Sequence, residues 1–178
     1  MGHNESRPPG RILALDPGHS RTGIALSDPE GCLATPLETV SAPPGRLVTH
    51  VLELIARHQV TAVVIGLPRL PSGDEGEVAA LSRHLAERIG RAAGVPVVLR
   101  DEALTSWEAE ELLRGPGEAA ARRGSGLPRP SRRRGRSGRA RRGEVDRVAA
   151  AIILQEYLDE LRRTAQRPGG ESNESARP

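Results

Sequence analysis

Apolar and polar residues follow one another along the chain in a pattern that predicts an α/β domain. Three predicted strands come first in close succession, which indicates an antiparallel meander. Two later strands alternate with amphipathic helices, which predicts parallel βαβ units and a mixed sheet with helices on its faces. The predicted strands are 11–15, 22–27, 32–40, 60–65 and 95–99, and the predicted helices lie at 47–55, 77–93, 105–114 and 144–163.

These elements predict one domain, since 178 residues are enough for a single hydrophobic core. We expect the domain to span 11–163, with an arginine-rich insertion at about 118–143. The chain ends, 1–10 and 164–178, are polar and predicted to be disordered, as is the arginine run 129–142.

Composition narrows the function classes. No apolar run is long enough to span a membrane, and the N-terminus lacks the apolar core of a signal peptide. The single cysteine, Cys32, excludes an intrachain disulfide and a cysteine-based zinc site. Aromatic residues make up 1% of the chain, so platforms for stacking nucleic-acid bases are nearly excluded. The prediction is a soluble cytoplasmic protein without a membrane partner.

Charge is distributed unevenly. The chain has 26 basic and 23 acidic residues, a formal net charge of +3, and all the basic side chains are arginine. Residues 122–142 hold ten arginines and no acid, so the remainder, with 16 basic and 23 acidic residues, has a net charge of −7. Clustered arginine binds phosphate well, so this segment indicates nucleic-acid contact or, alternatively, a solvated tail.

Two acids end predicted strands. Asp16 follows the first strand, and Glu102 follows the last one. In open α/β sheets ligands collect beyond the C-terminal ends of parallel strands, so both positions are candidate site residues. Taken alone, Asp16 also fits a simple Asp-Pro-Gly turn, and Glu102 fits a surface acid before a helix.

A third acid, Asp146, lies on the last predicted helix. At about 100° per residue it lies within roughly 20° of Ile153, a member of the apolar stripe. Its carboxylate therefore projects beside the buried face, where it needs a cation, a hydrogen-bond donor or a metal. An ion pair with a nearby arginine is the alternative to a metal.

Together, Asp16, Glu102 and Asp146 predict a metal site. Hard divalent ions such as Mg²⁺, or Mn²⁺ in its place, prefer carboxylate oxygens. Two such ions on a phosphodiester would activate a water and stabilise the leaving oxygen. The interpretation is a hydrolase acting on ester bonds by a two-metal-ion mechanism, in which the three acids are both the catalytic residues and the metal ligands.

Six stretches in this order resemble the YqgF family of Holliday-junction-resolvase-like proteins, which are also named as nucleases of pre-16S ribosomal RNA. They are LALDPGHSRTGIALSDPEG, ATPLETV, VVIGLP, SGDEGE, VPVVLRDEALTSWEAEELL and VDRVAAAIILQEYL. The resemblance implies an RNase H-like fold with a five-stranded mixed sheet, and its presumed catalytic acids fall at Asp16, Glu102 and Asp146. It implies a metal-dependent nuclease acting on structured RNA or DNA, with maturation of the 5′ end of 16S ribosomal RNA as the family role. The implied partners are pre-16S rRNA or the pre-ribosomal small subunit.

Four further residues are candidates for substrate binding. Gly18 could let a phosphate approach the backbone, and Arg21 could neutralise it. Gly66 leaves room at a strand exit, and Thr105 mainly caps a helix. Ser20 and Ala103 stand where the family usually has basic residues, and the arginine-rich segment could supply the lost charge.

Other functions stay open at this stage. A DNA resolvase of the Holliday-junction type would use the same acids, and paired cutting would require a dimer; a monomer or weak homodimer is expected. A non-catalytic nucleic-acid-binding module would have no reason to keep three acids at one edge. An ATPase of the actin and hexokinase type would need two such domains, and this chain has room for one.

Overall fold

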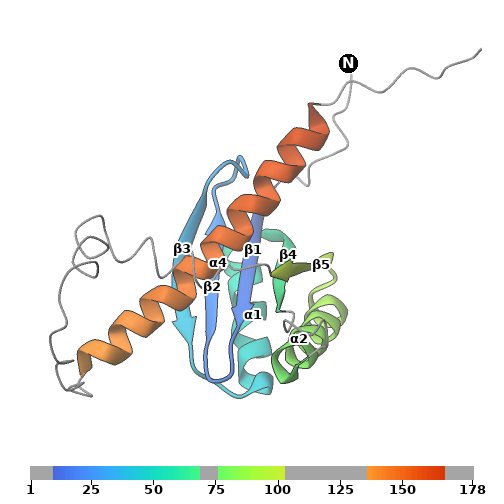
Figure 1. Cartoon of the computed structure of the whole chain (residues 1–178). Helices are drawn as coiled ribbons and strands as arrows, with labels where there is room; N and C mark the ends of the chain where they lie inside the picture. Colours follow the sequence, from blue (N-terminus) through green and yellow to red (C-terminus); the bar gives the residue numbers. More distant parts are fainter. Residues whose placement is uncertain (1–9, 69–75, 103–135, 167–178) are drawn as a thin grey trace, which may run out of the picture.

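The computed structural model describes residues 10–68, 76–102 and 136–166 of the chain, with the backbone alone at 102 and 136–141 (Figure 1). Five strands and three helices lie in these ranges. The strands are β1 (Arg11–Pro17), β2 (Thr22–Ser27), β3 (Ala34–Val40), β4 (Val60–Pro68) and β5 (Val97–Glu102). The helices are α1 (Pro44–His58), α2 (Glu77–Ala93) and α4 (Arg136–Ala165).

The strands form one mixed sheet in the order β3-β2-β1-β4-β5. β2 pairs antiparallel with both β1 and β3, whereas β4 pairs parallel with both β1 and β5. The predicted meander followed by parallel units is therefore confirmed. Because β1, β4 and β5 run in the same direction, their C-terminal ends lie together at one end of the sheet.

Helices cover both faces of this sheet. α1 and α2 pack on one face, and α4 crosses the other (Figure 1). Alternate residues of β1 supply the two cores, since Leu13 and Leu15 pack with α1 and α2, while Ile12 and Ala14 pack with α4. This alternation follows from the two-residue period of a strand, and it assigns each strand position to a face.

The sheet is lined with small residues under α4. Ala14, Ala25 and Ala62 are all buried on this face, and α4 contributes Ala150 and Ala151 to the same core. Short side chains on both surfaces let the helix backbone come close to the sheet. The position of α4 is therefore sensitive to small changes in side-chain volume.

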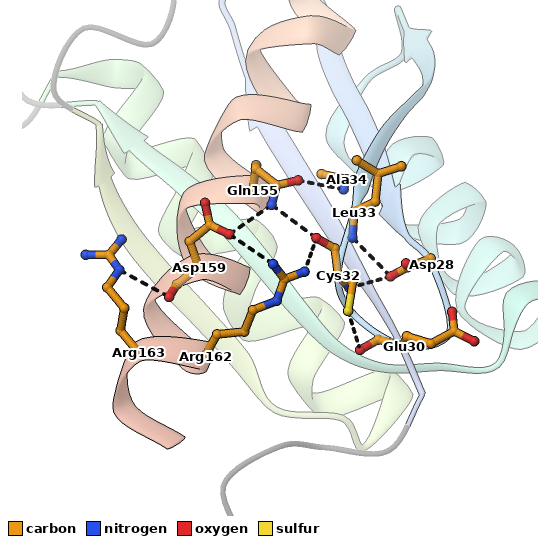
Figure 2. Close-up of polar contacts among 9 residues, drawn as sticks. All are labelled: Asp28, Glu30, Cys32, Leu33, Ala34, Gln155, Asp159, Arg162 and Arg163. Carbon is orange, nitrogen blue, oxygen red and sulfur yellow. Dashed lines mark hydrogen bonds and ion pairs between the residues drawn. The ribbon is translucent and has the colours of Figure 1, made fainter. Parts of the chain in front are cut away.

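A polar network fixes the C-terminal half of α4 to the turn between β2 and β3. Figure 2 shows Gln155 and Arg162 both directed at this turn. The Gln155 side chain accepts a hydrogen bond from the Ala34 N–H at 2.9 Å and donates one to the Cys32 carbonyl at 3.2 Å. Arg162 donates to the same carbonyl. These bonds set the register of α4 along β3.

A second contact holds the same half of the helix to β5. The Arg100 guanidinium donates to the Glu160 carboxylate at 2.5 Å and lies 5.9 Å from the centre of the Tyr157 ring. The hydrogen bond from Arg100 lowers the pKa of Glu160, and burial raises the pKa of Tyr157. The helix is thus attached at both edges of the sheet.

Several predicted boundaries were wrong by a few residues. β3 begins at Ala34 rather than at 32, because the Asp28 carboxylate accepts hydrogen bonds from the N–H groups of Cys32 and Leu33 and holds them in the turn. β4 continues to Pro68 and β5 covers Val97–Glu102, because parallel pairing extends through these residues.

The largest difference concerns the last helix. It was predicted to begin at Glu144 after a disordered arginine run, but α4 begins at Arg136 and ends at Ala165. The added residues 136–143 include four arginines and an alanine, which favour helices, and two glycines, which do not, and they lack the apolar stripe on which the prediction relied. The C-terminal tail was predicted to be disordered from 164, but α4 includes 164 and 165. The predicted helix 105–114, most of the insertion at 118–143 and the rest of the predicted disordered ends 1–10 and 164–178, apart from residues 10 and 166, lie outside the described residues.

In the described part of the chain, no helix has both the length and the apolar character needed to cross a membrane.

Candidate active site

A cleft of about 270 Å³ opens at the end of the sheet where β1 and β4 end. Its walls come from the end of β1, the loop after it, the end of β4, the first turn of α2, and α4. The lining residues are Asp16, Pro17, Gly18, His19, Arg21, Pro68, Val78 and Asp146. Two of the three predicted acids therefore share one cleft.

Asp16 reaches the cleft through its position in β1. It has the same strand parity as Ile12 and Ala14, whose side chains pack with α4, so it lies on the α4 face of the sheet. It is half-buried and pairs in register with Gly23 of β2. The two-residue period that buries the start of β1 thus directs an acid towards α4 at its end.

Gly23 brings the second acid beside the first. A Cβ atom at this position would lie 1.9 Å from the carbonyl oxygen of Asp146, which is far inside van der Waals contact. Only glycine therefore allows α4 to cross β2 at this point. Since Gly23 is paired with Asp16 and touches Asp146, it connects the two acids across the sheet.

The Asp146 carboxylate has a cationic partner. The Arg21 Nε donates to Asp146 Oδ2 at 2.6 Å, with about a quarter of each side chain exposed. The loop that carries Arg21 is closed by a 2.7 Å hydrogen bond from the Gly18 N–H to the Arg21 carbonyl. Of the partners left open for Asp146 by the sequence, the structure shows the arginine.

The structure brings some of the predicted residues together and not others. Asp16, Gly18, Arg21 and Asp146 line the cleft, whereas Gly66 does not and is buried in β4, opposite Arg100. The backbone of Glu102 pairs with Pro68, a residue of the cleft wall. The side chain of Glu102, all of Thr105 and Ala103 lie outside what is described.

The sequence did not predict that Pro68 and Val78 would line the cleft. Pro68 ends a strand whose neighbour carries Asp16, so topology could have indicated it. Val78 belongs to the apolar stripe of α2 and was expected in the core. It reaches the cleft because α2 begins beside the end of β4, which the pattern of a single helix does not reveal.

The three-acid metal site stays a prediction. Among the described side chains, no group of three His, Cys, Asp or Glu residues could hold a metal ion. The carboxylates of Asp16 and Asp146, which line one cleft, nevertheless form part of a donor set that suits a hard divalent ion. The third ligand would have to come from Glu102.

The chain is similar to known proteins over most of its length. Residues 10–127 match the model of the RuvX family, described as a Holliday junction resolvase. A Thermobifida fusca protein named "Putative pre-16S rRNA nuclease" is 42% identical over 161 residues, which cover 90% of this chain and 94% of the relative. A protein of the same name from Roseiflexus is 38% identical over 158 residues, which cover 88% of this chain and 99% of the relative.

Solved structures bear out the fold. RuvC from Thermus thermophilus, in a structure described as a complex with Holliday junction substrate, superposes with a TM-score of 0.51 and 21% identity. The match covers 87% of this chain and 97% of that one. The five-stranded mixed sheet with helices on both faces is therefore an RNase H-like fold, as predicted.

Proposed function

Because the chain belongs to the RuvX family, we propose that it is a nuclease that hydrolyses phosphodiester bonds in structured RNA and matures the 5′ end of pre-16S ribosomal RNA in the cytoplasm. The observation that carries this proposal is the meeting of Asp16 and Asp146 in one cleft at the ends of parallel strands. The names of the relatives support the choice of RNA as substrate.

Asp16, Asp146 and Glu102 would hold Mg²⁺ or Mn²⁺ in this cleft. Support for Glu102 comes from the backbone, since its position pairs with Pro68 in the cleft wall and has the same parity as Arg100, which contacts α4. When bound, divalent ions supply an activated water and stabilise the leaving oxygen. The chain's own task is then to place the carboxylates and to hold the substrate phosphate.

Arg21 is the residue that we assign to the substrate phosphate. Its guanidinium is partly exposed in the cleft and fixed by a short loop. A planar guanidinium can bind two phosphate oxygens at once. Gly18 contributes backbone geometry, because its N–H is already bonded to the Arg21 carbonyl and a Cβ there would approach that oxygen to 3.1 Å.

The test is cleavage of a 16S transcript that carries its 5′ precursor extension, in the presence of Mg²⁺ or Mn²⁺. We expect Asp16→Asn to lower the cleavage rate by at least about 100-fold, since a lost ligand removes several kcal/mol of stabilisation from the transition state. Glu87→Gln, a similar carboxylate-to-amide change on the exposed side of α2, should keep the wild-type rate. Circular dichroism checks that both variants fold. Cleavage by Asp16→Asn at the wild-type rate would refute the acid mechanism.

DNA junction resolution is the second candidate, and the description of the family model is the observation that favours it. A four-way DNA junction tested beside the RNA distinguishes the two substrates. Faster cleavage of the junction at equal concentration would replace the RNA proposal. Binding of either substrate without cleavage under any divalent ion would favour a non-catalytic module.

A further inference from the structure

The start of α4 carries arginines that the proposed cleft does not use. Four arginines and no acid lie within 136–142, all inside the helix. Arg142 is exposed. Figure 1 shows this end of α4, in orange, extending past the edge strand β3.

Contacts with the sheet fix where the start of α4 lies. Thr39, Gly23 and Asp16 form one row across β3, β2 and β1 by strand register. α4 follows this row, because the Thr39 hydroxyl donates to the Gly143 carbonyl at 2.5 Å and the Asp146 backbone lies on Gly23. Moving along the helix from Asp146 towards 136 therefore leads over β3 and off the sheet edge.

Helix geometry then determines which arginines continue the cleft. At about 100° per residue, Arg139 lies roughly 20° from Asp146 around the helix and Arg142 lies roughly 40° from it. Arg141 lies about 140° away, and Glu144 about 160° away. Glu144, the acid closest in sequence to Arg142, thus lies on the side of the helix opposite to Asp146. Its carboxylate is 3.9 Å from the guanidinium of Arg147.

Both arginines lie a short distance from the cleft along the helix axis. With a rise of 1.5 Å per residue, Arg142 and Arg139 lie about 6 and 10 Å from Asp146 along the helix. A strand that leaves the cleft along this part of α4 would therefore pass both arginines within about 10 Å of Asp146. Counterion release from such contacts would make binding dependent on salt.

We propose that the face of α4 carrying Arg139 and Arg142 binds the sugar-phosphate backbone that flanks the scissile phosphate, so that the substrate strand runs from the cleft across β3 and along the first turns of α4. This surface rests on the proposed function, because the cleft at Asp16 and Asp146 defines where the strand begins. The partner of this surface is a nucleic-acid strand, which it binds through the phosphates and not through the bases.

The test compares two double variants that remove the same charge. Arg139→Gln with Arg142→Gln changes the proposed surface, and Arg141→Gln with Arg163→Gln changes α4 on the other side and at the far end. Binding of a labelled RNA hairpin with single-stranded flanks is measured across a salt series in EDTA, so that no cleavage occurs. A DNA hairpin of the same sequence forms the second arm.

We expect the slope of log K against log salt to fall by about 1.5 in magnitude for the first double variant, at about 0.7–0.9 for each lost phosphate contact. The control pair should lose less than half of that. Equal slopes for the two pairs, or no binding by the wild type, would overturn the proposal. A changed thermal stability with an unchanged slope would do the same, because it would mean that these arginines contact the chain's own acidic domain. A slope difference in a protein that cleaves nothing would keep this surface and refute only the nuclease.

Discussion

The ion pair between Arg21 and Asp146 balances the negative charge of Asp146 in the cleft. Asp146 leans towards the buried face of α4, and a carboxylate there needs a cation. Arg21 fills this need at 2.6 Å. A metal ion at Asp146 would compete with the guanidinium for this carboxylate, and a displaced guanidinium would be available to a substrate phosphate. Arg21 would thus pair with Asp146 before the metal binds and with a substrate phosphate afterwards.

We expect Arg21→Gln to bind Mn²⁺ about threefold more tightly than the wild type when no RNA is present. The reason is that Asp146 no longer has a competing cation, and a partly exposed ion pair contributes up to about 1 kcal/mol. Binding of RNA should weaken in the same variant, because a phosphate contact is lost. Isothermal titration of Mn²⁺ and a separate RNA titration in EDTA measure the two effects.

Arg91→Gln is the matched control, since it removes one arginine from an exposed pair with Glu87 on α2. Both affinities should stay at the wild-type values there. Weaker Mn²⁺ binding by Arg21→Gln would show that the guanidinium orients Asp146 for the metal instead of competing with it.

For single residues, the sequence predicted Asp16 and Asp146 as members of the candidate site but not the residues that they contact. Asp16 was found from its place after a buried strand, and Asp146 from its angle beside Ile153. The pairing of Asp146 with Arg21 was left open, because the two residues are 125 positions apart and only the folded sheet brings them together. A local sequence pattern predicts which side of a helix or strand a residue occupies, but it does not predict which distant residue it contacts.

At the scale of elements, the crossing of α4 over β2 places the site. Small side chains line this contact, and the closest approach is at Gly23. The network at Gln155 and Arg162 holds the other end of the helix (Figure 2). A change at Gly23 should therefore rotate or lift the part of α4 that carries Asp146, while the far end stays attached.

We expect Gly23→Ala to lower the free energy of unfolding by about 3 kcal/mol, because the added methyl group meets backbone atoms that cannot move independently. The measurement is urea denaturation followed by circular dichroism. Gly45→Ala in the first turn of α1 is the control, since the nearest atom to its Cβ is the end of the Arg88 side chain at 4.0 Å. Equal stability of the two variants would mean that α4 does not pack on Gly23.

The elements themselves were largely predictable. β2 and α2 have the predicted bounds, because apolar periodicity continues to their ends. The first two turns of α4 were missed for the opposite reason, since they have helix-forming residues but no apolar stripe. The start of β3 was missed because the side chain of Asp28 determines it, and not the pattern of the strand.

In the whole molecule, the candidate site lies at the C-terminal ends of strands that are distant in sequence. β1 and β5 flank β4, so Asp16 and the position of Glu102 lie on either side of one strand. The sequence predicted the mixed sheet and its parallel units, and the resemblance to the YqgF family implied five strands, but neither gave the order in which β4 lies between β1 and β5. The cleft itself could not be predicted, because its walls also need the start of α2 and the loop after β1.

A protein that uses the cleft at Asp16 and Asp146 as its active site should cut one strand at a time. Paired cutting of a four-way junction needs two sites related by symmetry, and therefore a dimer. On a supercoiled plasmid with an extruded cruciform, we expect nicked circles to accumulate before any linear product, as gel electrophoresis over a time course would show. Sedimentation velocity at the same protein concentration should give a monomer. Linear plasmid formed without a nicked intermediate, together with a dimer in the centrifuge, would contradict this expectation and make junction resolution the better assignment of the cleft at Asp16 and Asp146.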